Sequence, residues 1–373
     1  MSPDPRFARL PPASPARAAL HEFLDRHARF LLTTHVNPDG DAIGSEVAFA
    51  ELLRAKGKSV RILNDSVVPH AFEWLTRRWP VESYTEPLAE QRFAEADALV
   101  VLDTGNRQRL GRLAAHLDRH AIAVAVVDHH VTHDGFGQVN VIEPACAATA
   151  VIVHELMLEA GVPPDPLAAD ALYVGLATDT GHFRYSNTDP RTLRMAADLV
   201  ERGVDVARVN ARVHQSAPAG RLRFFGEALA ALEQHAGGRL VVLDVGPEAF
   251  QRHGLSGPDT EGLVDLPRAI EGVEAVALFS EVDPGRVKVS LRSTGRVSVH
   301  GVCSRLGGGG HMHAAGVQLR GTREQARARI LPELERLIAA LGPAPEGAPS
   351  PDAADAARIG SAAAPPGSGG AAD

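Results

Sequence analysis

Four short, largely apolar segments in the first 130 residues limit the fold more than any other feature of the sequence. They span residues 30–34, 59–63, 98–102 and 122–127. Segments this short and apolar are typical of strands buried on both faces, and intervening helices indicate that such strands are parallel. The sequence therefore predicts an α/β domain whose parallel sheet is covered by helices on both faces.

The pattern changes beyond a Pro- and Gly-containing segment near residues 216–220. From there the spacing predicts helices over 222–234, 297–306 and 323–341, with strands over 239–245, 275–281 and 286–292. This mixture is typical of a smaller α+β domain. We therefore expect an N-terminal extension (1–20), a first domain (21–212), a linker (213–222), a second domain (223–341) and a disordered tail (342–373).

Composition excludes several classes of protein. The 373 residues carry a formal net charge of -8, which argues against wholesale binding of duplex DNA. The two cysteines, Cys146 and Cys303, are far apart and form no CxxC motif, as in a reduced cytoplasmic protein. The first residues lack the apolar core of a signal peptide, and no apolar run is long enough to span a membrane. We therefore expect a cytoplasmic protein without a membrane partner.

Carboxylate and imidazole side chains follow three of the four predicted strands. They are His35, Asp39 and Asp41 after the first strand, Asp103 after the third, and Asp128, His129 and His130 after the fourth. The predicted helix 167–177 leads into Asp179. Each motif alone is almost equally typical of a solvated turn or a helix N-cap. Because parallel strands end at one edge of the sheet, where ligands bind, we expect these side chains to converge.

Four carboxylates and two imidazoles are too many ligands for one small metal site. They suit two divalent cations that share a bridging carboxylate. The mixed donor set favours Mn²⁺ and leaves Mg²⁺, Co²⁺ or Zn²⁺ open. Two ions about 4 Å apart would clamp a phosphoryl group and lower the pKa of a bridging water. The pattern therefore indicates phosphoester hydrolysis.

These motifs resemble those of a known family. His35-Xaa3-Asp39-Xaa-Asp41, Asp103-Thr104-Gly105, Asp128-His129-His130 and Asp179-Thr180-Gly181 resemble the four motifs of the DHH phosphoesterase superfamily, in order. The glycine run 307–310, followed by His311 and Ala314-Ala315-Gly316, resembles the DHHA1 signature. The size of the chain, and residues 260–265 ahead of Arg268, are most similar to the oligoribonuclease/3′-phosphoadenosine-5′-phosphate phosphatase subgroup.

The resemblance implies a role for each residue. His35 and Asp39 would hold one ion, Asp41, His129 and Asp179 would hold the other, and Asp103 would bridge them. His130 would stabilise charge in the transition state or assist the leaving group. Asp128 would orient a ligand histidine, although a helix N-cap is a close alternative. A catalytic cleft between the two domains and a homodimer are further family-based expectations.

In the second domain, residues 286–292 alternate strictly between polar and apolar. On a strand, Arg286, Lys288, Ser290 and Arg292 would share one face. Such a face is usually just solvated, and a glycine run is often just a flexible loop. Glycines also let backbone N–H groups approach a phosphate closely. The resemblance implies that Arg292, Gly309, Gly310 and His311 bind the substrate.

The sequence leaves three functions to be separated. The first is hydrolysis of short single-stranded RNA to 5′-mononucleotides, together with dephosphorylation of 3′-phosphoadenosine 5′-phosphate. The second is hydrolysis of a cyclic dinucleotide such as c-di-AMP, or of its linear product. The third is nucleotide binding without catalysis. Other histidines, including His70, His116, His120 and His235, lack recognisable partners and are predicted to lie at the surface.

Overall fold

The computed structural model describes residues 14–215, 218–260 and 262–342. The chain divides into two compact units between residues 217 and 218. This position lies inside the predicted linker, but helix α8 (Val206–His214) extends into that range and helix α9 (Ala219–Ala230) begins within it. The segment without helix is therefore shorter than predicted. Most of the predicted extension and tail, residues 1–13 and 343–373, lie outside the described residues.

The first unit contains a six-stranded sheet in which every pairing is parallel, as predicted. Its spatial order is β3-β2-β1-β4-β5-β6. The strands are β1 (Arg29–Thr33), β2 (Ser59–Asn64), β3 (Val81–Ser83), β4 (Ala98–Leu102), β5 (Ala123–Asp128) and β6 (Val139–Ile142). The edge strands β3 and β6 were not predicted, because they are short and only partly buried.

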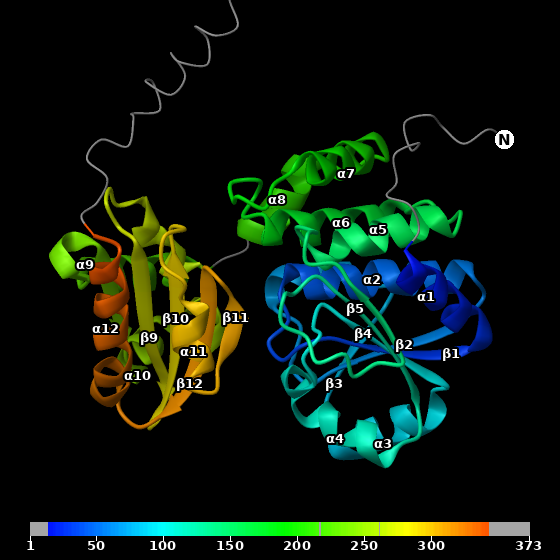
Figure 1. Ribbon diagram of the computed structural model, residues 1–373, viewed down its shortest axis with the longest axis horizontal. Coiled ribbons are helices and arrows are strands. Elements are labelled where there is room, and N and C mark those ends of the chain that lie inside the picture. Colours follow the sequence, from blue (N-terminus) through cyan, green and yellow to red (C-terminus); the bar gives the residue numbers. More distant parts are fainter. Residues whose placement is uncertain (1–13, 216–217, 261, 343–373) are drawn as a thin grey trace, which may run out of the picture. The chain divides into compact units, whose positions relative to one another are not determined.

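Helices cover both faces of this sheet, with α2, α5 and α6 on one face and α3 and α4 on the other (Figure 1). The helices of this unit are α1 (Pro15–Arg26), α2 (Gly40–Ala55), α3 (Glu86–Glu95), α4 (Ala114–Arg119), α5 (Thr149–Glu159), α6 (Pro166–Asp179), α7 (Pro190–Glu201) and α8, with 3-10 segments η2 (His70–Leu75) and η3 (Arg107–Leu113). Successive strand residues alternate between the two cores, so that Leu32 and Val100 pack toward α2 while Leu31 and Val101 pack toward α3. This alternation explains why the strands read as continuous apolar runs.

Helix α1 is part of the first unit, so the predicted extension over residues 1–20 is wrong from residue 15 onward. Arg17 is 1% exposed. Its guanidinium donates to Glu143 at 2.6 Å, to Glu155 at 2.7 Å and to Glu159 at 2.8 Å. These three partners lie more than 120 residues away, which is why the sequence did not reveal them.

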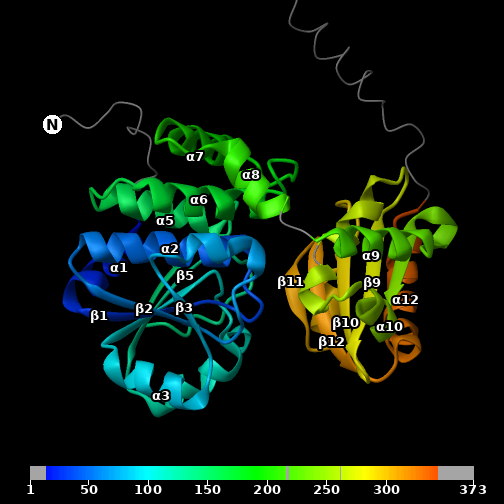
Figure 2. The ribbon, with the colours of Figure 1, turned by 180° about the vertical axis from the view of Figure 1, so that it is seen from behind.

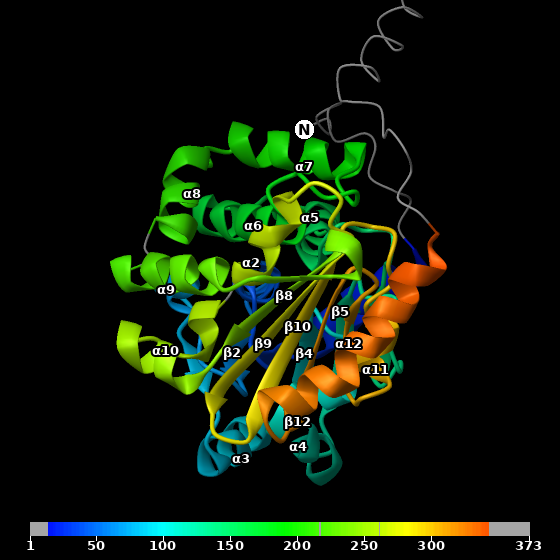
Figure 3. The same ribbon diagram turned by 90° about the vertical axis from the view of Figure 1, so that its left-hand side faces the viewer.

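The second unit is an α+β domain around a mixed sheet ordered β11-β12-β10-β9-β8-β7, in which only β8 and β9 pair in parallel. Helices α9 and α10 lie on one side of this sheet, and α11 and α12 lie on the other (Figures 2 and 3). Its elements are β7 (Glu233–His235), β8 (Leu240–Val245), β9 (Ala275–Asp283), β10 (Arg286–Ser293), β11 (Gly309–His311), β12 (Ala314–Arg320), α9, α10 (Pro247–His253), α11 (His300–Ser304), α12 (Arg323–Ala340), η4 (Ala236–Gly238), η5 (Gly257–Thr260) and η6 (Leu263–Ala269).

Two predicted helices of this unit are shorter than expected. The predicted helix 222–234 ends at Ala230, and the chain continues into strand β7. The predicted helix 297–306 is reduced to α11, because Gly307 and the glycines after it lead directly into strand β11. Among the described residues, no helix combines the length and the apolar character needed to cross a membrane.

Candidate metal centre and active site

The strand order of the first unit explains why distant ligands converge. Strand β1 pairs with both β2 and β4, so the direction in which successive strands are added to the sheet reverses between β1 and β4. Open α/β sheets bind ligands at such a point, beyond the carboxyl ends of the strands. His35 follows β1 closely, and Asp103 directly follows β4. Asp103 adopts a φ of 59°, a left-handed conformation that is strained for a residue other than glycine. Such strain is common where a fold holds a functional side chain in place.

The six predicted ligands form two groups that share Asp103. The first group is His35, Asp39 and Asp103, and the second is Asp41, His129 and Asp179, with Asp103 also grouped with His129 and His130. The two carboxylate oxygens of Asp103 approach different imidazoles. Its Oδ2 lies 3.4 Å from His35 Nε2, and its Oδ1 lies 3.5 Å from His129 Nε2. This is the arrangement expected of a carboxylate that bridges two cations.

The remaining ligands complete the two groups. Asp39 Oδ2 lies 3.8 Å from His35 Nε2, while its Oδ1 caps helix α2 by accepting from two backbone amides. Asp179 Oδ2, at the last residue of α6, lies 3.1 Å from His129 Nε2, and Asp41 Oδ2 lies 3.9 Å from the same atom. The N-cap alternative for Asp39 is therefore correct for one oxygen and leaves the other oxygen facing the centre.

Backbone contacts orient both ligand imidazoles. His35 Nδ1 lies 2.9 Å from the carbonyl of Val36, and His129 Nδ1 lies 3.1 Å from the carbonyl of Cys146. A carbonyl can only accept, so each Nδ1 donates to it, and Nε2 is the nitrogen that faces the centre and could bind a cation. His35 Nε2 is buried and makes no hydrogen bond among the described residues. This buried, unsatisfied acceptor fits a bound cation.

The carboxylate of Asp41 is held by the amino terminus of α5. Its Oδ2 accepts from the Thr149 amide at 2.6 Å and its Oδ1 accepts from the Ala150 amide at 2.9 Å. The hydroxyl of Thr149 also donates to Asp103 Oδ1 at 3.0 Å. Helix α5 therefore fixes two ligands of the centre, and its N-terminal dipole favours their negative charge.

Burial and neighbouring charges shift the pKa values of Asp41, Asp103 and Asp179. Burial, together with the neighbouring charges of Asp103 and Asp179, raises the pKa of Asp41 well above its usual value. Burial also raises the pKa of Asp179 to about 6, although His129 opposes this shift. Burial opposes ionisation of Asp103 as well, but contacts with His35, His130 and His129 lower its pKa. Positive charge at the centre would relieve this repulsion, which is what divalent cations supply.

His130 faces the centre without joining either ligand triad. Its Nδ1 donates to Asp128 Oδ1 at 2.7 Å, and its Nε2 lies 3.1 Å from an Arg109 guanidinium nitrogen. Asp128 therefore orients His130, not the ligand histidine that was predicted. The helix N-cap alternative is also wrong, because Asp128 ends strand β5 and strand β6 follows it.

The predicted substrate-binding residues of the second unit lie toward the β11 edge of its sheet, on β10 and on β11 itself. Arg292 of β10 is in register with Ala314 of β12, and Ala314 is in register with His311 of β11. Arg292 Nε lies 3.3 Å from Asp265 Oδ1, and the same oxygen accepts from Arg268 at 3.1 Å. Asp265 therefore holds two guanidinium groups near this edge.

The second half of the glycine run, Gly309 and Gly310, belongs to edge strand β11, although a flexible loop was the alternative. A Cβ on Gly308 would lie 2.3 Å from the Gly316 carbonyl oxygen, and one on Gly310 would lie 2.4 Å from the Ala314 carbonyl oxygen. These two glycines permit β11 to pack against β12. A Cβ on Gly309 would meet nothing within 4 Å, so the backbone is accessible there. This agrees with a position where a ligand can approach the main chain.

Comparison with known proteins decides the family. The DHH family N-terminal domain model matches residues 29–176, and the DHHA1 domain model matches residues 237–340. The bifunctional oligoribonuclease and PAP phosphatase NrnA of Thermus thermophilus is 34% identical over 312 residues, which cover 83% of this chain and 90% of that protein. The chain belongs to the DHH family. It is a DHH phosphoesterase, and the family prediction from its motifs is confirmed.

Other relatives agree with this assignment. The Bacillus subtilis protein of the same name is 25% identical over 313 residues, covering 82% of this chain and 94% of that protein. An exopolyphosphatase-related protein from Bacteroides fragilis superposes with a TM-score of 0.80 at 24% identity, covering 86% of this DHH chain and 96% of that chain. RecJ from T. thermophilus in complex with Mn²⁺ superposes with a TM-score of 0.50 at 16% identity, covering 88% of this chain and 56% of RecJ. These superpositions confirm the predicted fold.

Arg109 is a residue of the site that sequence reasoning missed. It lies in the 3-10 segment η3, six positions after Asp103, and only the fold brings its guanidinium to His130. A single arginine among the many of this chain gave no signal. Thr149 was also missed, because it lies 46 residues from Asp103 in the sequence and only the fold brings the two side chains together.

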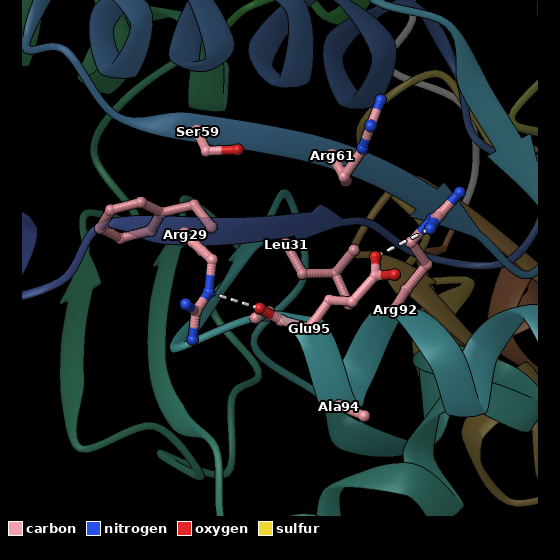
Figure 4. Close-up of a pocket in the computed structure, with 9 residues that line it drawn as sticks. Arg29, Leu31, Ser59, Arg61, Arg92, Ala94 and Glu95 are labelled. Carbon is pink, nitrogen blue, oxygen red and sulfur yellow. Dashed lines mark hydrogen bonds and ion pairs between the residues drawn. The ribbon is translucent and has the colours of Figure 1, made fainter.

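A pocket of about 430 Å³ lies elsewhere in this DHH domain, at the amino-terminal ends of β1 and β2 (Figure 4). Arg29 and Arg92, two of its basic residues, are neutralised by nearby acids. Arg29 pairs with Asp97, and Arg92 pairs with Glu82 and Glu95. The ligand residues follow the opposite, carboxyl ends of the strands, so this pocket is not part of the candidate metal centre.

Proposed function

We propose that this protein uses two divalent cations to hydrolyse short oligoribonucleotides to 5′-mononucleotides and to dephosphorylate 3′-phosphoadenosine 5′-phosphate. The observation that carries the proposal is the position of Asp103, whose two oxygens approach the imidazoles of two separate ligand groups. The similarity to proteins named as oligoribonuclease and PAP phosphatase supports the choice of substrates.

The residues present fit two cations. His35, Asp39 and Asp103 would hold one, and Asp103, Asp41, His129 and Asp179 would hold the other. Carboxylates with neutral imidazoles favour Mn²⁺, and Mg²⁺ or Co²⁺ remain open. When bound, the two cations supply a hydroxide at neutral pH and neutralise charge on the phosphoryl oxygens.

The other side chains would act on the phosphoryl group. Arg109 would leave His130 and donate to a non-bridging phosphoryl oxygen, whose charge grows toward the transition state. Asp128 fixes the ring of His130 through Nδ1, and Nε2 would face the leaving oxygen as the general acid. Thr149 and the amino terminus of α5 keep Asp103 and Asp41 in place throughout.

In the second unit, we assign the groups beyond the scissile phosphate to the β10–β11 edge. Arg292 would bind a second phosphate, and the accessible backbone at Gly309 would approach a base or phosphate. Gly310 and His311 continue the same strand. A small number of basic contacts is consistent with a short substrate, because long nucleic acids are usually held by many phosphate contacts.

A substrate panel with the full-length chain and Mn²⁺ tests the proposal. It should compare dinucleotides, 24-mer RNA, 3′-phosphoadenosine 5′-phosphate, a cyclic dinucleotide and its linear product. We expect the dinucleotide and 3′-phosphoadenosine 5′-phosphate to be hydrolysed fastest. Asp103→Ala should abolish turnover of every substrate. The control is Asp118→Asn, which replaces an exposed acid of α4 and should leave turnover unchanged.

Three results would contradict the proposal. Preference for the 24-mer would exclude a short-substrate enzyme, and preference for the cyclic dinucleotide would favour a cyclic-dinucleotide phosphodiesterase. Tight binding of 3′-phosphoadenosine 5′-phosphate by the Mn²⁺-loaded protein without phosphate release would indicate a binding protein. Circular dichroism of Asp103→Ala would show whether lost activity reflects the site or the fold.

A further inference from the structure

A second group of metal-type side chains lies on the helical layer formed by α3 and α4, which are adjacent in Figure 1. It consists of Glu90 from α3 with His116 and His120 from the end of α4. The prediction that both histidines lie at the surface is wrong for His116, which is fully buried, and His120 is largely buried. None of the three belongs to the DHH motifs or to the candidate metal centre.

The spacing of these side chains suits a tetrahedral ion. Glu90 Oε2 lies 3.2 Å from His116 Nδ1, and Glu90 Oε1 lies 3.1 Å from His120 Nε2. Ligand atoms about 2.0 Å from a tetrahedral Zn²⁺ are separated from each other by about 3.3 Å. These two distances are near that value, although they involve different Glu90 oxygens, and one donor atom of each residue lies within 4.8 Å of the others, so side-chain adjustment would bring the three donors onto one cation. Two imidazoles and one carboxylate also leave the fourth position for water.

Both nitrogens that face Glu90 are buried atoms without a hydrogen bond among the described residues. His116 is held by its surroundings, since its ring stacks on Phe93 with centroids 5.1 Å apart. Each nitrogen has the Glu90 carboxylate as an ion-pair contact and makes no hydrogen bond to it, and a cation bound by all three groups would satisfy both nitrogens.

The surrounding charges are compatible with this binding mode. Arg119 forms its shortest ion pair with Glu86 at 2.6 Å and lies 3.5 Å from Glu90. His116 Nε2 lies 3.2 Å from Arg119 and 3.6 Å from Glu86 Oε2. With a cation on Nδ1, the proton of His116 would move to Nε2 and face Glu86. A carboxylate behind a ligand histidine is the usual support for zinc sites.

We propose that Glu90, His116 and His120 form a binding site for a divalent transition-metal cation of the Zn²⁺ type, separate from the catalytic centre. His116 lies on α4, His120 is its C-cap residue, and Glu90 lies on α3, so a bound ion would fasten the end of α4 to α3. The inference does not depend on the substrate of the enzyme. The donor set excludes Mg²⁺ and Ca²⁺, which prefer oxygen ligands.

Zinc titration of the full-length protein tests this inference. Wild-type protein, His120→Ala and Glu90→Gln would be stripped with a chelator and titrated with Zn²⁺ alone by calorimetry. A matched control is His70→Ala, since His70 faces Glu73 at 3.2 Å in an exposed pair without a second histidine. We expect each site variant to lose one equivalent of bound Zn²⁺, or to bind it at least about 100-fold more weakly. His70→Ala should titrate like the wild type.

Cobalt provides a readout that lost packing would not change. Co²⁺ in a four-coordinate site absorbs visible light more strongly than in sites of higher coordination, so wild-type protein should show a band that both site variants lack. Turnover with Mn²⁺ should be the same in all four proteins, because the site is not catalytic. The inference is overturned if His120→Ala and Glu90→Gln bind as much Zn²⁺ as the wild type with equal affinity. That result would indicate only an ion-pair network around Arg119.

Discussion

Glu46 provides a quantitative test of the electrostatics behind the metal centre. It lies on α2, is fully buried, and accepts one hydrogen bond from Asn64 Nδ2 at 2.9 Å. Its other oxygen has no partner among the described residues. Burial raises the pKa of Glu46 from 4.5 to about 8; the Asn64 hydrogen bond opposes this shift, and the charge of Asp103 adds to it. The carboxyl is therefore protonated in the folded protein at neutral pH.

The sign and size of the effect follow from linkage. The folded state holds this proton between pH 4.5 and about 8, whereas the unfolded state has released it. The free energy of unfolding therefore falls as the pH rises through this window. The loss reaches its full size once the pH exceeds the pKa of Glu46 in the folded state. The shift corresponds to on the order of 5 kcal/mol in the free energy of unfolding. Glu46→Gln removes the charge and should not incur this cost at any pH.

Urea denaturation of the chelator-treated protein at about pH 5, 7 and 9 measures the effect. We expect the free energy of unfolding of Glu46→Gln, minus that of the wild type, to grow with pH by several kcal/mol. Glu22→Gln replaces an exposed acid of α1 and should show no such growth. A difference that stays constant between pH 5 and 9 would refute the reasoning, since it would mean that Glu46 titrates normally in the folded protein.

Three further substitutions test the site and its support. Arg109→Ala should lower kcat/KM by about 100-fold, because it removes the proposed donor to the phosphoryl group. The affinity for Mn²⁺ in calorimetry should not change, because Arg109 is not a candidate metal ligand. An unchanged kcat/KM would exclude the role as a donor. Gly175→Ala should weaken Mn²⁺ binding at least about tenfold, because its Cβ would lie 2.7 Å from Asp41 Oδ1. Gly226→Ala meets nothing within 4 Å and is the control, so equal affinities in the two variants would contradict the argument. Arg17→Met should lower the free energy of unfolding by about 4 kcal/mol in urea, since it leaves three carboxylates without their buried partner; a loss below 1 kcal/mol would show that water reaches them.

The central strands and the convergence of the candidate ligands could be predicted because each depends on local sequence. Strand β4 is five apolar residues, and Asp103 follows it directly. The same reasoning places His35 after β1 and Asp179 at the end of α6. To predict that these side chains meet at one edge of the sheet, only one further inference was needed, namely that the strands are parallel. That inference holds in the structure.

The features that could not be predicted depend on contacts between distant residues. Strands β3 and β6 are edge strands with little apolar pattern, and only their neighbours in the sheet define them. His116 has the sequence context of a surface residue, but the stacking of Phe93 and the packing of α3 bury it. The partner of Asp128 was predicted wrongly because both neighbouring imidazoles are adjacent in sequence, and only the strand end decides which one it faces.

The protein holds the candidate ligands of the metal centre in position, and this has a thermodynamic consequence. Asp41 cannot move away from Asp103 and Asp179 without losing two backbone hydrogen bonds at the start of α5. The acids therefore reduce their repulsion by raised pKa values, as for Asp41 and Asp179, or by neutralisation with cations. Protons and metal ions then compete for the same carboxylates, so metal binding must release protons, and affinity must fall as the pH drops below about 6. A cation that binds only the folded site also stabilises it, by about 2.7 kcal/mol at a concentration 100-fold above its Kd. The centre that we propose for hydrolysis should for this reason also stabilise the first unit.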